Sequence, residues 1–162
     1  MGGSGRPPTP PRLRADVTSA LRRVPRASVR RGPRVQHAPS CVGVDLVDVP
    51  DFERRFEGRD DALAEIFTRG ELTYCRRQPR PWPHLAARFA AKEALLKALT
   101  SGATGAMRWH DIEVRRDPAG TPRLIVTGAT RGALDRHGLA ACSVSLSHTA
   151  SHAIAVVLLS PA

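Results

Sequence analysis

The pattern of apolar and polar positions predicts regular structure from residue 41 onward. Residues 41–49 form an apolar, β-branched run typical of a buried strand. Pro50 then opens a predicted helix, and a second helix covers residues 60–67. Thr68 and Glu71 have the spacing of a capping box, which predicts the start of a third helix.

The strongest helical pattern follows a proline-containing loop and runs from about His84 to Leu99. At about 100° per residue, apolar side chains form one stripe along this helix: Leu85, Phe89, Leu96 and Leu99. Lys92 falls in the middle of the stripe, while Glu93 and Lys97 lie on the adjoining face. An exposed Glu–Lys pair four residues apart would account for Glu93 and Lys97 but not for Lys92. Because these two lysines are the only lysines of the chain, the segment indicates a functional site.

The second half of the chain predicts strands. Residues 111–116 and 123–127 form a hairpin pattern, and a short helix covers about 130–137. Two further strands are predicted at 142–147 and 153–159. We therefore expect an α+β fold in which an antiparallel sheet packs against the long helix.

Composition separates residues 1–40 from residues 41–162. The first segment is rich in Pro, Gly, Ser and Arg, and holds nine arginines and one aspartate, a balance of +8. We expect a disordered extension there, followed by one domain at 41–162. A solvated tail, an organelle-targeting peptide and upstream sequence from a wrongly chosen start all fit the extension.

Charge and cysteine content limit the classes of function. Of the net charge of +10, only +2 remains for residues 41–162, so nucleic-acid binding is not expected of the domain. The three cysteines show no CxxC spacing, which favours a reducing compartment and hence the cytoplasm. No apolar run is long enough for a membrane span, so we expect no membrane partner.

Two carboxylates and nearby basic residues suggest phosphate chemistry. Asp45 lies inside an apolar strand, where an isolated carboxylate is costly; pairing with arginine, helix capping and metal binding are all open. With Glu93 it offers hard oxygen ligands that suit Mg²⁺. Arg88, Lys92 and Lys97 would suit a polyphosphate substrate. The chain has no P-loop and no G-x-G-x-x-G, so side chains and metal would have to hold the phosphates.

Hydroxyl groups and imidazoles gather near residues 145–152. A Ser–His–Asp hydrolase is disfavoured because no G-x-S-x-G elbow is present. His148 and His152 are four apart in a predicted turn rather than a helix, so they do not predict a metal site. We interpret one of them as a donor to a ligand or as part of the turn surface.

Three segments in order resemble a known family. Residues 42–48, 88–98 and 144–149 are similar, in sequence and spacing, to holo-(acyl-carrier-protein) synthase, the short type of 4′-phosphopantetheinyl transferase. The resemblance covers about 41–159. It implies transfer of the phosphopantetheine arm of coenzyme A to a serine of an apo acyl carrier protein of fatty-acid or polyketide synthesis. Adenosine 3′,5′-bisphosphate would be released. The nucleophile would come from the partner.

The resemblance also implies roles for individual residues. Asp45 and Glu93 would hold Mg²⁺ on the pyrophosphate of coenzyme A, and Lys97 would neutralise charge on the transferred phosphate or its leaving group. Arg88 and Lys92 match positions near the coenzyme A phosphates. Neither the residues nor the resemblance identifies the general base, for which a metal-bound water and Glu93 are the candidates.

The remaining implied contacts involve other chains. Pro122 and Ser147 would reach the nucleotide from a neighbouring subunit of a homotrimer, with His148 next to them. The arginines of the first helix, Arg54, Arg55 and Arg59, would dock the acidic carrier, although a solvated helix face explains them equally well. Ser143 stands where many members of the family have a histidine, which puts one nucleotide contact in question.

Overall fold

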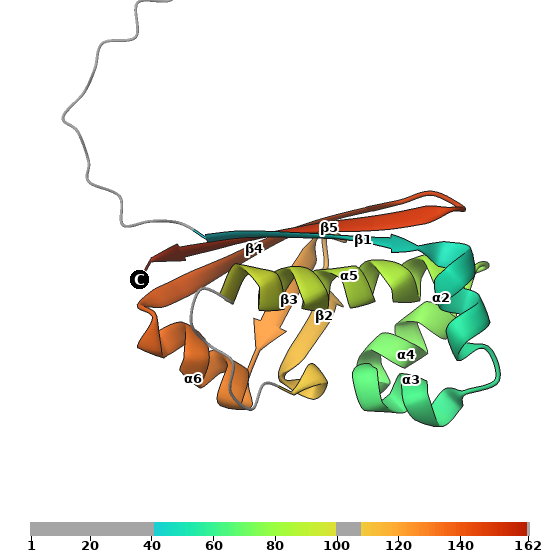
Figure 1. Ribbon diagram of the computed structural model, residues 1–162, viewed down its shortest axis with the longest axis horizontal. Helices are drawn as coiled ribbons and strands as arrows, with labels where there is room; N and C mark the ends of the chain where they lie inside the picture. Colours follow the sequence, from blue (N-terminus) through green and yellow to red (C-terminus); the bar gives the residue numbers. More distant parts are fainter. Residues whose placement is uncertain (1–40, 100–107, 162) are drawn as a thin grey trace, which may run out of the picture. The chain divides into compact units, whose positions relative to one another are not determined.

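The structure is a computed structural model that describes residues 41–99 and 108–161 (Figure 1). The predicted extension at 1–40 lies outside these ranges. The elements, in chain order, are β1 (Cys41–Asp48), α2 (Val49–Phe56), α3 (Asp60–Ile66), α4 (Arg69–Arg76), α5 (Pro81–Leu99), η2 (Trp109–Asp111), β2 (Ile112–Arg116), β3 (Pro122–Val126), α6 (Gly128–Arg136), β4 (Leu139–His148) and β5 (His152–Pro161). The α+β class predicted from the sequence is confirmed.

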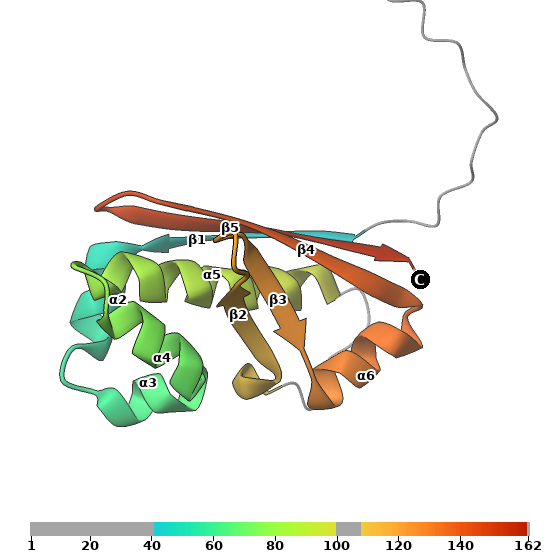
Figure 2. The same cartoon turned by 180° about the vertical axis from the view of Figure 1, so that it is seen from behind.

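An antiparallel sheet of order β1-β5-β4 covers one side of α5, and β2 and β3 form a separate antiparallel hairpin. Figures 1 and 2 show α5 lying under the sheet, with α2, α3 and α4 at one end and the hairpin and α6 towards the other. The predicted packing of an antiparallel sheet on the long helix is therefore confirmed.

The first strand is buried on one face only. Its alternate residues point away from α5, and together with those of β5 they form an exposed apolar face: Val42, Val44, Leu46, Ile154, Val156 and Leu158. These residues pair across the two strands, for example Val44 with Val156. The prediction of a fully buried strand at 41–49 was wrong, because a run of β-branched residues does not reveal whether anything covers its second face.

Gly43 lets β1 approach α5 closely. A Cβ atom at this position would lie 1.8 Å from the carbonyl oxygen of Ala94. Both residues are buried, and strand and helix meet there backbone against backbone. Asp45 follows two residues later on the same face of β1, so this contact brings its carboxylate towards α5.

The long helix begins earlier than the sequence pattern predicts and is buried on more than one side. It starts at Pro81, since proline is tolerated in the first helical turn, so the proline-containing loop before the helix is shorter than predicted. The alanines that flank the leucine stripe are also buried: Ala86, Ala87, Ala90, Ala91, Ala94 and Ala98. The helix is therefore a central element rather than an amphipathic surface helix.

Caps fix the helices around α5. The side chain of Asp48 accepts a hydrogen bond of 2.8 Å from the backbone N–H of Asp51 and so caps α2. The predicted capping box is present at α4: the Thr68 hydroxyl accepts from the Glu71 N–H, and the Glu71 carboxylate accepts from the Thr68 N–H. None of the helices within the described ranges is long and apolar enough to cross a membrane.

Candidate functional site

Asp45 and Lys97 form an ion pair between β1 and α5. The ammonium Nζ of Lys97 donates to Oδ1 of Asp45 at 2.6 Å. The Asp45 side chain is 13% exposed, whereas that of Lys97 is 53% exposed, so the carboxylate is mostly covered and its partner comes from the solvent side. Asp45 therefore has a charged partner, as the cost of burying it predicts.

Glu93 lies in the same groove as Asp45. The groove, of about 760 Å³, runs between β1, α2 and α5, and its apolar wall includes Phe52, Phe56 and Phe89. Burial raises the pKa of Glu93, the negative charge of Asp45 raises it further, and the ammonium of Lys97 opposes both effects. The structure thus brings together three residues that the sequence singled out, two carboxylates and one ammonium, at one place.

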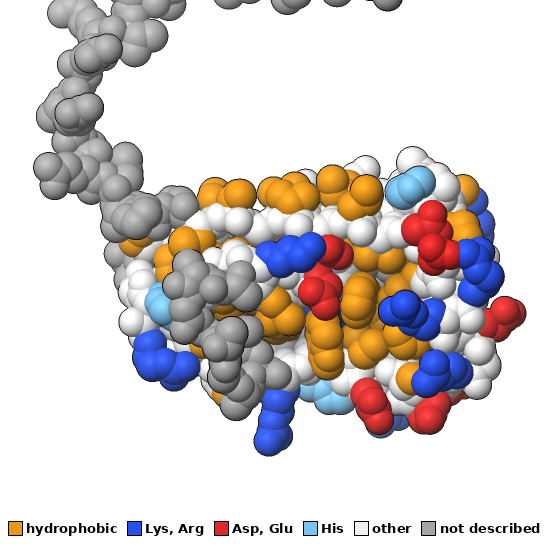
Figure 3. All heavy atoms as spheres, viewed as in Figure 1, with side chains coloured by type: hydrophobic (Ala, Val, Ile, Leu, Met, Phe, Trp, Pro, Cys, Tyr) orange, Lys and Arg blue, Asp and Glu red, His pale blue; other side chains and the backbone are white. Residues whose placement is uncertain are grey.

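Arginines on or just after α2 border the same groove; Arg59, predicted on the first helix, instead lies directly before α3. Arg54, Arg55 and Arg59 all line it, and Arg54 forms an ion pair with Asp51 one turn earlier. Figure 3 shows acidic side chains with a basic one beside them in the middle of this face, surrounded by apolar side chains. The groove therefore combines a carboxylate pair, an apolar wall and a basic border.

A second pocket collects other residues predicted to contact coenzyme A. Arg88, Pro122, Ser147 and His148 all line this pocket of about 160 Å³, which shares no lining residue with the first groove. Arg88 is 4% exposed, and its Nε has no hydrogen-bond partner among the described residues. Within one chain, the predicted site is therefore divided between two places.

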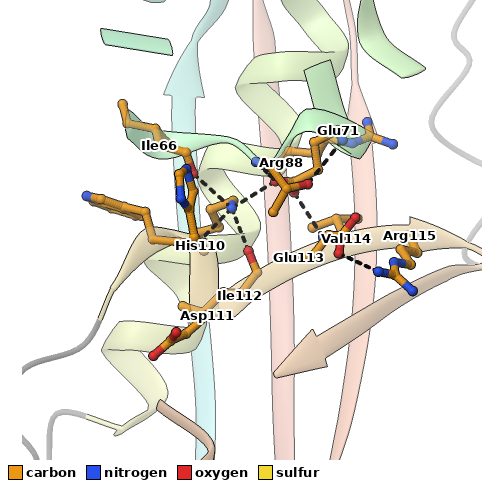
Figure 4. A network of polar contacts seen from close by, with 12 residues as sticks. Ile66, Glu71, Arg88, His110, Asp111, Ile112, Glu113, Val114 and Arg115 are labelled. Atoms are coloured by element: carbon orange, nitrogen blue, oxygen red, sulfur yellow. Dashed lines mark hydrogen bonds and ion pairs between the residues drawn. The ribbon is translucent and has the colours of Figure 1, made fainter. Parts of the chain in front are cut away.

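Lys92 does not reach either pocket, and its predicted role as a contact to phosphate is wrong for this structure. The side chain is fully buried, and its ammonium forms an ion pair with Glu71 at 2.9 Å. It also donates to the carbonyl oxygens of Ile66, Trp109 and Ile112 (Figure 4). The apolar stripe on the sequence marked the core correctly, and the ammonium is held there by partners far away in the chain.

Glu71 completes this network and was predicted only as a capping residue. Its Oε1 accepts a 2.9 Å hydrogen bond from the backbone N–H of Val114, while Oε2 serves both the cap and Lys92 (Figure 4). The network therefore ties α4, α5 and β2 together. The capping-box spacing was the only signal in the sequence for Glu71.

The sequence pattern missed three residues around Arg88. The guanidinium carbon of Arg88 lies 4.2 Å from the centre of the Tyr74 ring, and that of Arg116 lies 5.7 Å from it. His84 packs edge-on against His148, with ring centres 4.7 Å apart, and its pKa is lowered, mainly by burial and then by His148. No local spacing could reveal these contacts, because their members come from different elements.

Comparison with known proteins identifies the family. The sequence pattern of the 4′-phosphopantetheinyl transferase superfamily matches residues 41–157. The chain belongs to this superfamily. It is an enzyme of the holo-(acyl-carrier-protein) synthase type, as the sequence resemblance predicts.

Several relatives support this assignment. The holo-[acyl-carrier-protein] synthase of Moorella thermoacetica is 41% identical over 116 residues, which cover 72% of this chain and 90% of the relative. The holo-[acyl-carrier-protein] synthase of Geobacter sulfurreducens is 42% identical over 118 residues, which cover 72% of this chain and 94% of the relative.

Solved structures agree with the sequence relatives. An ACPS–CoA complex from Chronobacterium ammoniagenes has a TM-score of 0.66 at 28% identity, and the match covers 77% of this chain and 99% of that one. The acyl carrier protein synthase of Mycobacterium tuberculosis has a TM-score of 0.59 at 35% identity, and the match covers 75% of this chain and 97% of that one.

Proposed function

We propose that this enzyme transfers the 4′-phosphopantetheine group of coenzyme A to a serine of an apo acyl carrier protein, releases adenosine 3′,5′-bisphosphate, and requires Mg²⁺. The observation that carries the proposal is that Asp45 and Glu93 line one groove and that Lys97 forms an ion pair with Asp45. The superfamily match and the names of the relatives support the reaction class.

Asp45 and Glu93 fit a magnesium site. Both offer hard oxygen atoms, they come from different elements, and the charge of Asp45 acts on Glu93, so a cation between them would relieve their repulsion. Within the described ranges, no group of three or more His, Cys, Asp or Glu side chains could hold a metal ion. Two carboxylates, completed by phosphate oxygens and water, are the ligand set that Mg²⁺ commonly uses in proteins.

The chain's own residues would do the remaining work. The serine oxygen of the carrier forms a new bond to phosphorus, and the bond from that phosphorus to the bridging oxygen breaks, so that adenosine 3′,5′-bisphosphate leaves with the electron pair. Bound Mg²⁺ would neutralise charge on the pyrophosphate. Lys97 would stabilise the charge that develops on the phosphate oxygens, and Arg88 would hold a phosphate of coenzyme A. A metal-bound water and Glu93 are our candidates for accepting the serine proton.

A homotrimer would unite the two pockets. The exposed apolar face of β1 and β5 is the kind of surface that other subunits cover (Figure 3). In such an assembly, Pro122, Ser147 and His148 of one subunit would approach the groove of its neighbour. The separation of these residues from Asp45 within a single chain supports a site shared between subunits.

The basic border of the groove would receive the carrier protein. Arg54, Arg55 and Arg59 lie on or just after α2, at the edge of the groove that holds the carboxylates. Attraction between these arginines and an acidic carrier would steer its serine towards Lys97.

The three cysteines, Cys41, Cys75 and Cys142, are all free, which supports a reducing compartment such as the cytoplasm.

Intact-mass spectrometry of the carrier tests the proposed reaction. The enzyme is incubated with apo acyl carrier protein, coenzyme A and Mg²⁺, with EDTA in a parallel sample. We expect the carrier to gain the mass of one phosphopantetheine only when the metal is present. If several acidic carrier proteins are tested and none of them gains mass, the proposal is refuted.

Variants locate the reaction in the groove. Asp45→Asn should abolish the mass gain, whereas Asp135→Asn, the same change at an exposed ion pair on α6, should leave it intact. Replacing both Arg54 and Arg55 by Glu should raise KM for the carrier, and the effect should shrink with salt. An unchanged KM would place carrier docking elsewhere.

A further inference from the structure

The ion pair between Lys97 and Asp45 occupies an oxygen that a metal ion would need. Oδ1 of Asp45 accepts from the ammonium at 2.6 Å, a short distance even for a charge-assisted hydrogen bond. The two residues are 52 positions apart and come from β1 and α5, so the fold itself creates this contact.

The exposure of the two side chains is asymmetric. Asp45 is 13% exposed and sits on the strand, whereas Lys97 is 53% exposed and carries its charge on a flexible four-carbon stem. The carboxylate is therefore the fixed member, and the ammonium can move away without moving the backbone.

The charges of the cluster favour one bound cation. Asp45 and Glu93 together carry two negative charges when ionised, and Lys97 supplies one positive charge. Asp45 and Glu93 line the same groove and the charge of Asp45 acts on Glu93, so removal of the ammonium leaves two carboxylates there without their positive partner. A divalent cation would neutralise both, but it would repel an ammonium ion held on the same oxygen.

We propose that Lys97 is the resident counter-ion of Asp45 in the metal-free enzyme, and that it must leave this carboxylate when a divalent cation binds. This inference rests on the proposed function, because it takes Asp45 as a ligand of the metal. The metal then binds weakly to the enzyme alone and more tightly when a substrate phosphate offers Lys97 a new anionic partner. Binding of the metal and of coenzyme A is coupled through one side chain.

Direct measurement of metal binding tests the inference without relying on activity. Mn²⁺ is titrated into the full-length, coenzyme-free protein, and free Mn²⁺ is followed by electron paramagnetic resonance. Lys97→Met keeps the length of the side chain and removes its charge. We expect Kd for Mn²⁺ to fall roughly three- to tenfold relative to the wild type, as the loss of a partly exposed ion pair implies.

Two variants separate competition from general electrostatics. Lys97→Arg keeps a positive charge at the position and should bind Mn²⁺ about as weakly as the wild type. Arg55→Met removes a positive charge from another element of the same groove and should change Kd less than Lys97→Met does. Equal tightening by Arg55→Met and Lys97→Met would overturn the inference, since only the total charge would then matter.

Other outcomes distinguish this inference from the proposed metal site. If Lys97→Met binds Mn²⁺ as weakly as the wild type or more weakly, Lys97 does not compete with the metal for Asp45. The proposal is also overturned if neither Lys97→Met nor the wild type binds Mn²⁺ measurably. If Asp45→Asn binds Mn²⁺ as well as the wild type does, the assignment of Asp45 as a ligand is itself wrong. The transfer of phosphopantetheine is decided separately by the mass of the carrier.

Discussion

Replacement of Lys92 by methionine should destabilise the fold without impairing the affinity of the folded enzyme for coenzyme A. Methionine has a similar length and is apolar, so it fills the space of Lys92 but removes the ammonium. The change leaves the carboxylate of Glu71, which is 1% exposed, without its charged partner. It also takes a donor away from three backbone carbonyl oxygens.

The expected loss of stability is large compared with the stability of a typical domain. Removing one member of a buried ion pair costs about 3–5 kcal/mol, because the remaining charge stays buried and unpaired. A domain of this size is stable by about 5–15 kcal/mol in total. Glu71→Gln in the Lys92→Met background removes the second charge, so the double variant should lose clearly less than the sum of the two single losses.

Urea unfolding provides the measurement. The chain has two tryptophans, Trp82 and Trp109, and the carbonyl group of Trp109 is itself bound by Lys92, so fluorescence reports on this region. Protein concentration must be held constant, because subunit association contributes to apparent stability. In parallel, KM for coenzyme A is measured on each variant at a temperature where it remains folded.

The reasoning fails if Lys92→Met unfolds at the same urea concentration as the wild type and raises KM for coenzyme A several-fold. That pattern would mean that the ammonium serves the substrate rather than the core. Losses of stability that simply add in the double variant would also contradict this role of Lys92. Once the ammonium of Lys92 is gone, replacing Glu71 by Gln should destabilise the fold less than it does in the wild type.

Three further predictions concern the sheet and the hairpin. Gly43→Ala should cost about 3 kcal/mol or more in urea unfolding, because its Cβ would meet the carbonyl oxygen of Ala94; a loss below about 1 kcal/mol would contradict the close contact. Val44→Lys, at a position 46% exposed, should reduce the mass measured by light scattering from a trimer to a monomer while circular dichroism is retained; an unchanged mass would exclude this face from the interface. The hydrogen bond from Arg115 is the main reason why the pKa of Glu113 lies below its usual 4.5. The ionised carboxylate of Glu113 therefore stabilises the fold above that value, and this stabilisation is lost as the pH falls through the lowered pKa. Glu113→Gln should therefore lose less stability than the wild type between about pH 6 and about pH 3, as measured by urea unfolding, and equal losses would refute this role.

Much of the fold was predictable because its signals are local. The capping box of Thr68 and Glu71 depends on a spacing of three residues, and the hairpin of β2 and β3 depends on a turn between two apolar runs. The pairing of Asp45 was also predictable, since an unpaired carboxylate in an apolar strand is costly. What the sequence could not supply was the partner, because Lys97 is 52 residues away.

The errors arose where long-range packing decides. The outer face of β5 is apolar like its inner face, and because none of the described residues covers the outer face, Val156 is exposed while the next residue, Val157, is buried. Likewise, the pocket with Arg88, Pro122 and His148 joins α5, β3 and β4. No spacing within one element encodes such a meeting.

Lys92 and Glu93 show most clearly why residue type alone does not assign a role. They are neighbours on α5, and because each residue turns the helix by about 100°, they face different surroundings. Lys92 points into the core and meets Glu71, while Glu93 borders the groove that contains Asp45. A buried network on one side of α5 therefore sets the rotation of the helix, and that rotation aims Glu93 at the groove. The two adjacent charges thus have complementary tasks: one fixes the helix, and the other depends on its being fixed.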